Sequence, residues 1–124
     1  METAVERWQA IIDARAQQMD AAYAELGRSS TGYWDRRARR YHDSTKNTVA
    51  NDPFFHRLRS VITPQTSVLD IGAGSGRFAL ALAPLVKQVI AVEPNAAMLE
   101  YLRQDAQSLN LTNISYSQNT WQDQ

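Results

Sequence analysis

A glycine-rich turn between a short strand and a helix constrains this 124-residue chain more than any other feature of its sequence. Residues 67–71 (SVLDI) are a short run of strand-forming residues, and residues 72–76 (GAGSG) follow at once. Helical periodicity then resumes at Arg77. Glycines at such a turn permit positive φ angles and let a ligand approach the backbone where a Cβ would obstruct it. The pattern therefore predicts a ligand-binding loop at the end of a strand.

The remainder of the second half continues this alternation of strand and helix. Residues 88–93 predict a second strand, residues 96–109 a helix and residues 113–117 a third strand. Strands and helices of these lengths imply right-handed crossovers and a parallel sheet, which needs helices on both faces. We therefore predict an α/β fold with an incomplete β-α-β-α-β parallel sheet of about three strands.

Two regions are predicted from these patterns. Residues 1–62 form an N-terminal helical region, and residues 63–124 form the sheet region with the glycine loop. The helical region contains a long amphipathic helix over 3–27 and shorter helices near 33–43 and 53–62. The apolar stripe of the long helix is most simply explained by packing on the protein's own body. A self-associating or partner-binding helix is the alternative.

Composition and charge exclude several classes of protein. Thirteen basic residues balance thirteen acidic ones, so no net field draws the chain to nucleic acid or membrane. The absence of cysteine excludes disulfides, thiolate metal sites and cysteine nucleophiles, and we expect no metal site. Four arginines within residues 36–40 could contact phosphate or RNA, but a solvated basic helix face is the simpler interpretation. Without a membrane span or signal pattern, the cytoplasm is the expected compartment.

An acidic residue at the end of the second predicted strand narrows the class of ligand. Glu93 lies where an acidic side chain in a nucleotide-binding βαβ unit accepts hydrogen bonds from both ribose hydroxyls. The dinucleotide fingerprint G-x-G-x-x-G would require glycine at position 77, where this chain has Arg77. The loop instead reads G-x-G-x-G with Asp70 two residues upstream, which disfavours a nicotinamide enzyme.

This arrangement resembles motif I of the class I S-adenosylmethionine-dependent methyltransferases. Residues 68–83 (VLDIGAGSGRFALALA) resemble that motif over its whole length, and residues 89–103 (VIAVEPNAAMLEYLR) resemble the segment that follows it. The resemblance implies a Rossmann-like fold and S-adenosylmethionine as the cofactor. The complete class I sheet is larger than three strands. The resemblance therefore also implies that this chain is the N-terminal part of a methyltransferase, truncated and inactive alone.

The same resemblance assigns cofactor-binding residues one by one. The methionine and ribose end of the cofactor is expected at Asp70, Gly72, Ala73, Gly74 and Gly76, with Glu93 at the ribose hydroxyls. Positions that flank the adenine are matched by Pro94, Asn95, Met98, Asn119 and Trp121. Thr120 stands where the family commonly has an acidic residue. Pro94 and Asn95 could equally begin a helix, and Met98 and Trp121 could equally be core residues.

The segment before the predicted sheet also resembles a pattern of this family. Residues 33–41 resemble a Trp-Asp-x-x-Ala pattern that precedes the core in many of these enzymes, whose N-terminal helices cover the cofactor. Trp34 and Tyr41 are therefore candidates for lining its pocket. Neither His42 nor His56 lies at a predicted strand end, and no catalytic residue is assigned.

Two classes of function follow. The first is the cofactor-binding part of a methyltransferase acting on a small molecule, with RNA and protein acceptors as alternatives. The second is a non-catalytic interaction or oligomerisation module that uses the helix over 3–27. Unpaired edges of a short parallel sheet and uncovered helix faces also predict self-association, through the sheet edge or through this helix.

Overall fold

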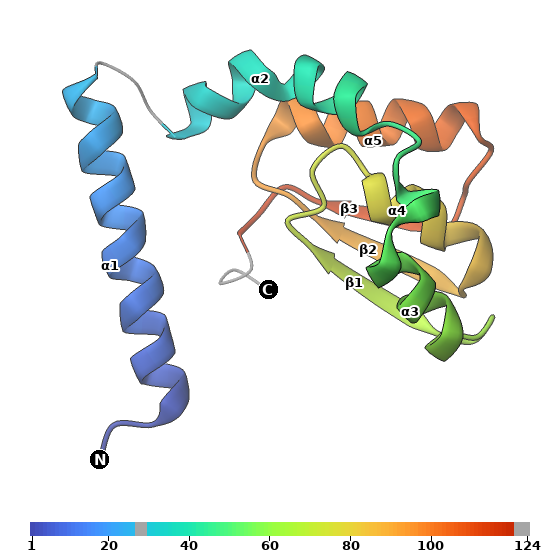
Figure 1. Cartoon of the computed structure of the whole chain (residues 1–124), viewed down its shortest axis with the longest axis horizontal. Coiled ribbons are helices and arrows are strands. Elements are labelled where there is room, and N and C mark those ends of the chain that lie inside the picture. The colour runs from blue at the N-terminus through green and yellow to red at the C-terminus, as the bar shows by residue number, and fades with distance from the viewer. Residues whose placement is uncertain (27–29, 121–124) are drawn as a thin grey trace. The chain divides into compact units, whose positions relative to one another are not determined.

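A computed structural model describes residues 1–26 and 30–120 of the chain (Figure 1). The chain divides into two compact units, Met1–Arg36 and Arg37–Gln124. Within the described ranges, none of the helices is both long and apolar enough to cross a membrane.

Most of the first unit is the helix α1 (Ala4–Glu25). Thr3 and Glu6 form a reciprocal capping box at the start of this helix. The Thr3 amide donates to Glu6 Oε2 at 2.7 Å, and the Glu6 amide donates to Thr3 Oγ1 at 3.2 Å. No residue of α1 is buried, and several of its large apolar side chains, including Trp8 and Met19, are exposed.

The helix α2 (Ser30–Thr45) runs from the first unit into the second and is longer than the predicted helix near 33–43. The second unit then contains, in order, η1 (Val49–Asn51), α3 (Pro53–Val61), β1 (Ser67–Ile71), α4 (Arg77–Leu82), η2 (Ala83–Leu85), β2 (Gln88–Val92), α5 (Ala96–Ser108) and β3 (Ile114–Ser117). Side-chain caps begin two of these helices. Asp52 accepts from the Phe54 amide, and Asn95 accepts from the Met98 amide.

The three strands form one parallel sheet in the order β1-β2-β3. Alternate residues of each strand share a face, so Val68, Val89 and Ile114 lie together on one side of the sheet. This face packs against apolar side chains of α3, α4 and α5 to form the core, in which Leu102 and Val89 are fully buried. The predicted α/β fold with three parallel strands is confirmed.

The opposite face of the sheet is open at β1. Leu69 and Ile71 point to this face, and about half of each residue's surface is exposed (53% and 51%). A parallel sheet is normally covered on both faces. Within the described residues, the sheet is therefore an incomplete Rossmann-like one, as the sequence indicates.

Candidate functional site

The glycine loop folds back over the end of β2. The amides of Gly72 and Ala73 both donate to the carbonyl of Val92, at 2.8 and 3.0 Å. Gly72, Gly74 and Gly76 all have positive φ angles, of +72°, +57° and +99°. Because this backbone region is costly for residues with a Cβ, the repeated glycines are what allow so tight a turn here.

Gly76 has a second reason to lack a side chain. A Cβ at this position would collide with Leu102 of α5 and lie 3.1 Å from Leu80 of α4. Gly76 therefore lets α5 pack closely against the start of α4, with Leu102 fully buried in the core. By contrast, a Cβ at Gly72 would meet nothing within 4 Å.

Glu93 follows β2 directly and joins the glycine loop to the start of α5. Its Oε1 accepts a hydrogen bond from the Gly74 amide at 3.1 Å, and its Oε2 accepts one from the Asn95 amide at 2.8 Å. A partly buried carboxylate that accepts two backbone N–H groups is well held in position. The structure thus brings together Glu93 and the loop, which the sequence assigned to one site.

Asp70 lies on β1, beside the strand that ends in Glu93. Burial raises the pKa of Asp70 to about 6, and the negative charge of Glu93 adds to this shift. Its Oδ2 is buried and has no hydrogen-bond partner within the described residues. A cationic group placed between these two carboxylates would favour the ionised form of Asp70.

Four of the five residues predicted near the adenine are described by the structure, and one of them, Asn95, is the buried cap of α5. Pro94 is exposed, whereas Met98 is buried, with 3% of its surface exposed. Asn119 is exposed and donates to Ser117 Oγ at 2.9 Å. The fifth, Trp121, lies outside the described residues.

The two residues expected to line the cofactor pocket, Trp34 and Tyr41, fall in different units. Tyr41, in the part of α2 that belongs to the second unit, lies against the glycine loop, because a Cβ at Gly74 would be 3.5 Å from its Cε1. Trp34 belongs to the first unit, where its ring meets that of Tyr33 edge-on at 5.2 Å. The structure therefore brings Tyr41 to the loop.

Arg77 has a structural role that the sequence did not indicate. Its guanidinium lies 2.9 Å from Asp52 Oδ2 and donates through Nε to Thr48 Oγ1 at 2.8 Å. The residue that breaks the dinucleotide fingerprint thus ties the glycine loop to the cap of α3. Asp52 and Arg77 lie 25 residues apart in the sequence, so no local pattern indicates this pair.

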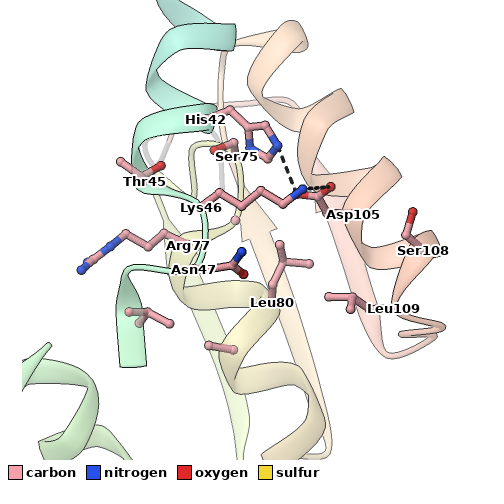
Figure 2. A pocket seen from close by; sticks show the side chains of 13 residues that line it. His42, Thr45, Lys46, Asn47, Ser75, Arg77, Leu80, Asp105, Ser108 and Leu109 are labelled. Carbon is pink, nitrogen blue, oxygen red and sulfur yellow. Dashed lines mark ion pairs between the residues drawn. The ribbon is translucent and has the colours of Figure 1, made fainter. Parts of the chain in front are cut away.

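A cavity of about 260 Å³ lies on another side of the loop (Figure 2). Its lining includes Ser75 and Gly76 from the loop, His42 and Lys46 from the end of α2, and Asp105 from α5. Asp70, Glu93 and Met98 are not among the lining residues. The cavity therefore shares Gly76 with the predicted cofactor-binding residues but not the two carboxylates Asp70 and Glu93.

A glycine loop that follows one parallel strand, with an acidic side chain ending the next, is typical of the nucleoside-binding part of a Rossmann-like protein. Residues 68–124 match the family described as "Methyltransferase domain". YcgJ of Bacillus subtilis, described as an uncharacterized methyltransferase, is 42% identical over 53 residues, which are 43% of this chain and 21% of that protein. These matches support the resemblance of residues 68–124 to the class I methyltransferases.

Solved structures of methyltransferases share this fold. Phosphoethanolamine N-methyltransferase 1 of Haemonchus contortus, in complex with phosphoethanolamine and S-adenosylhomocysteine, has a TM-score of 0.55 at 22% identity, over 84% of this chain and 22% of that one. An rRNA methylase from Streptococcus thermophilus has a TM-score of 0.53 at 23% identity, over 57% and 45%. The SMU.1697c protein of Streptococcus mutans, in complex with SAH, has a TM-score of 0.52 at 24% identity, over 53% and 38%. At these identities the likeness establishes the fold, and the chain spans about a fifth of YcgJ and less than half of each structure.

Proposed function

We propose that the second unit binds S-adenosylmethionine at the ends of β1 and β2, as the cofactor-binding part of a methyltransferase. The observation that carries this proposal is the pair of carboxylates at neighbouring strand ends, Asp70 and Glu93, beside the glycine loop. When bound, the cofactor supplies a methyl group already activated on a sulfonium. The residues of this chain then have to bind and orient it.

Glu93 fits the ribose of this cofactor. An ionised carboxylate has about four lone-pair sites, and the amides of Gly74 and Asn95 use two of them. The remaining sites can accept the two ribose hydroxyls without releasing the loop. Glu93 would then bind the ribose while holding the backbone that borders it.

Asp70 fits the charge of the cofactor. Its buried Oδ2 has no hydrogen-bond partner within the described residues. Its raised pKa shows that the ionised form of Asp70 is disfavoured when no cation lies nearby. The amino group and sulfonium of S-adenosylmethionine are both positively charged. Either directly or through the loop or a water, these charges would favour ionised Asp70 and lower its pKa.

The loop and the flanking positions complete the proposed site. Gly72, Ala73, Gly74 and Gly76 would border the methionine and ribose through their backbone, and Tyr41 would form one wall. Pro94, Met98, Asn119 and Trp121 would lie on the adenine side. Met98 reaches the ligand only if a side-chain rearrangement uncovers it, since it is buried within the protein.

For the acceptor, we propose a small molecule, with RNA and protein as alternatives. Methyl transfer from a sulfonium can proceed largely by positioning, so it needs an acceptor site more than a strong general base. None of the described residues is assigned to that site. We also propose that this chain is part of a longer enzyme and is inactive alone. A cytoplasmic location stays a prediction. A non-catalytic module is not favoured, because it would leave the carboxylate pair unexplained.

Calorimetric titration with S-adenosylhomocysteine tests the proposal. The wild-type chain should bind, and Glu93→Gln should bind at least about tenfold more weakly, because two charge-assisted hydrogen bonds to the ribose are lost. Glu100→Gln provides a matched control, since Glu100 is exposed on α5 and pairs with Arg103. Absence of wild-type binding, or equal binding by Glu93→Gln, would contradict the proposed site.

A further inference from the structure

The C-terminal half of α2 is anchored to α5 through one histidine. The ring of His42 stacks on that of Tyr101, with centroids 4.6 Å apart and planes at 16°. Its Nε2 lies 3.2 Å from Asp105 Oδ2 without the geometry of a hydrogen bond, and only 7% of the residue is exposed. Ala38, one turn earlier, is buried as well. These contacts set the rotation of this part of α2 about its own axis.

That rotation directs the preceding residue to the glycine loop. Successive residues of an α-helix are separated by about 100° around its axis. With His42 against α5, Tyr41 faces the loop, where a Cβ at Gly74 would lie 3.5 Å from Tyr41 Cε1. Gly74 therefore has the Tyr41 ring near its α-carbon and the Glu93 carboxylate on its amide.

Apolar packing alone does not hold this end of α2 in place. The cavity of about 260 Å³ lies between the end of α2, the loop and α5, and Figure 2 shows His42 and Lys46 directed at Asp105 across it. Lys46 Nζ is 3.8 Å from Asp105 Oδ1 and is half exposed, so this ion pair is weak. Most of the specific attachment is thus concentrated in His42 and its two partners.

We propose that His42, Tyr101 and Asp105 form a latch that holds Tyr41 against the glycine loop and slows release of the cofactor. The inference rests on the proposed function, because the latch acts on the site where the cofactor would bind. His42 is a positioning residue that acts through Tyr41. Opening the latch lets α2 move away from Gly74 and removes one wall of the site.

A double-mutant cycle on S-adenosylhomocysteine binding tests the latch. His42→Ala and Tyr41→Ala should each raise the dissociation constant by about fivefold, chiefly through a faster dissociation rate. The double variant should bind no more weakly than Tyr41→Ala, because both substitutions remove the same wall. Tyr101→Phe keeps the stacked ring and should bind like the wild type. Unchanged binding by His42→Ala, or effects that multiply in the double variant, would overturn the latch.

An NMR measurement without ligand separates the latch from the proposed function. In the wild-type chain, the ring current of Tyr41 should shift the α-proton resonances of Gly74, and Tyr41→Phe should preserve that shift. His42→Ala should abolish it while the amides of β1 and β2 keep their positions, which also shows that the variant is folded. If His42→Ala keeps the Gly74 shift, the latch is wrong whether or not the chain binds the cofactor. If His42→Ala unfolds, Tyr101→Leu and Asp105→Asn should each reduce the shift, and an unchanged shift in both overturns the latch.

Discussion

Glu93 Oε1 accepts a hydrogen bond from the amide of Gly74 at 3.1 Å, across 19 residues of sequence. This bond joins the end of β2 to the loop that follows β1. The other oxygen of Glu93 accepts from the Asn95 amide at the start of α5. One carboxylate therefore holds three segments at the edge of the sheet where we propose that the cofactor binds.

Replacement of Glu93 should lower stability as well as binding. In Glu93→Gln, the amide NH2 cannot accept a bond, so one of the Gly74 and Asn95 amides loses its acceptor. We expect a loss of about 1–2 kcal/mol in the free energy of unfolding, measured with urea. Glu100→Gln, an exposed carboxylate on α5, should change it by less than about 0.5 kcal/mol. Equal effects of the two variants would count against a structural role for Glu93.

Asp70 should make the unliganded chain less stable as the pH rises. Its pKa is about 6 in the folded chain and 3.8 in its ordinary state, so the folded chain holds more protons between these values. The free energy of unfolding should therefore fall from about pH 4 to pH 6, by on the order of 2 kcal/mol, and stay lower above pH 6.

Asp70→Asn should remove this pH dependence. The variant should be more stable than the wild type at pH 7.5, yet bind S-adenosylhomocysteine more weakly, because the carboxylate charge is lost. Urea unfolding at several pH values, combined with calorimetry, measures both effects. The prediction is wrong if the variant is less stable than the wild type at pH 7.5 and its free energy of unfolding still falls between pH 4 and pH 6. Asp70 would then not be the group that causes the pH dependence.

Two loop glycines should differ in their tolerance of alanine. Both Gly72 and Gly76 have positive φ angles, so alanine at either position carries a backbone cost of about 1–2 kcal/mol. Only at Gly76 would the new Cβ also collide with Leu102, which adds about 1–3 kcal/mol of overpacking. In thermal unfolding, the melting temperature should be highest for the wild type, lower for Gly72→Ala and lowest for Gly76→Ala. Equal melting temperatures for the two variants would contradict the close packing of α4 and α5.

Self-association remains a prediction with two candidate surfaces. Leu69, on the open face of the sheet, and Trp8, on the apolar stripe of α1, are both exposed. We expect sedimentation velocity to detect association of the wild-type chain. Leu69→Glu or Trp8→Glu should shift the chain towards monomer, and the more effective variant identifies the surface. A wild-type chain that is monomeric at all concentrations would refute the prediction.

Local patterns in the sequence were sufficient for much of the fold. Strand-forming residues, glycines and helix caps act over a few positions, so β1, the loop and the cap at Asn95 could all be predicted. Glu93 could be assigned to the loop's site because parallel strands end at the same edge of a sheet. Met98 could not be assigned, because an apolar residue on the inner side of a helix serves a core or a ligand equally well.

Contacts between distant side chains could not be predicted in this way. The Arg77–Asp52 ion pair and the His42–Asp105 pair join elements whose relative placement depends on packing of the whole unit. The raised pKa of Asp70 likewise follows from its burial and from the neighbouring strand that ends in Glu93. Sequence spacing carries no signal for such contacts, which is why the anchoring of α2 emerged only from the structure.

The most direct test of the proposed site is an NMR titration of the isotope-labelled chain with S-adenosylhomocysteine. We predict that the largest amide shifts occur at Gly72, Gly74, Glu93 and Asn95. Residues at the far end of the sheet, such as Lys87 and Asn113, should stay unchanged. Shifts confined to the cavity residues Lys46, Ser108 and Leu109, or no shifts at saturating ligand, would contradict cofactor binding at the ends of β1 and β2.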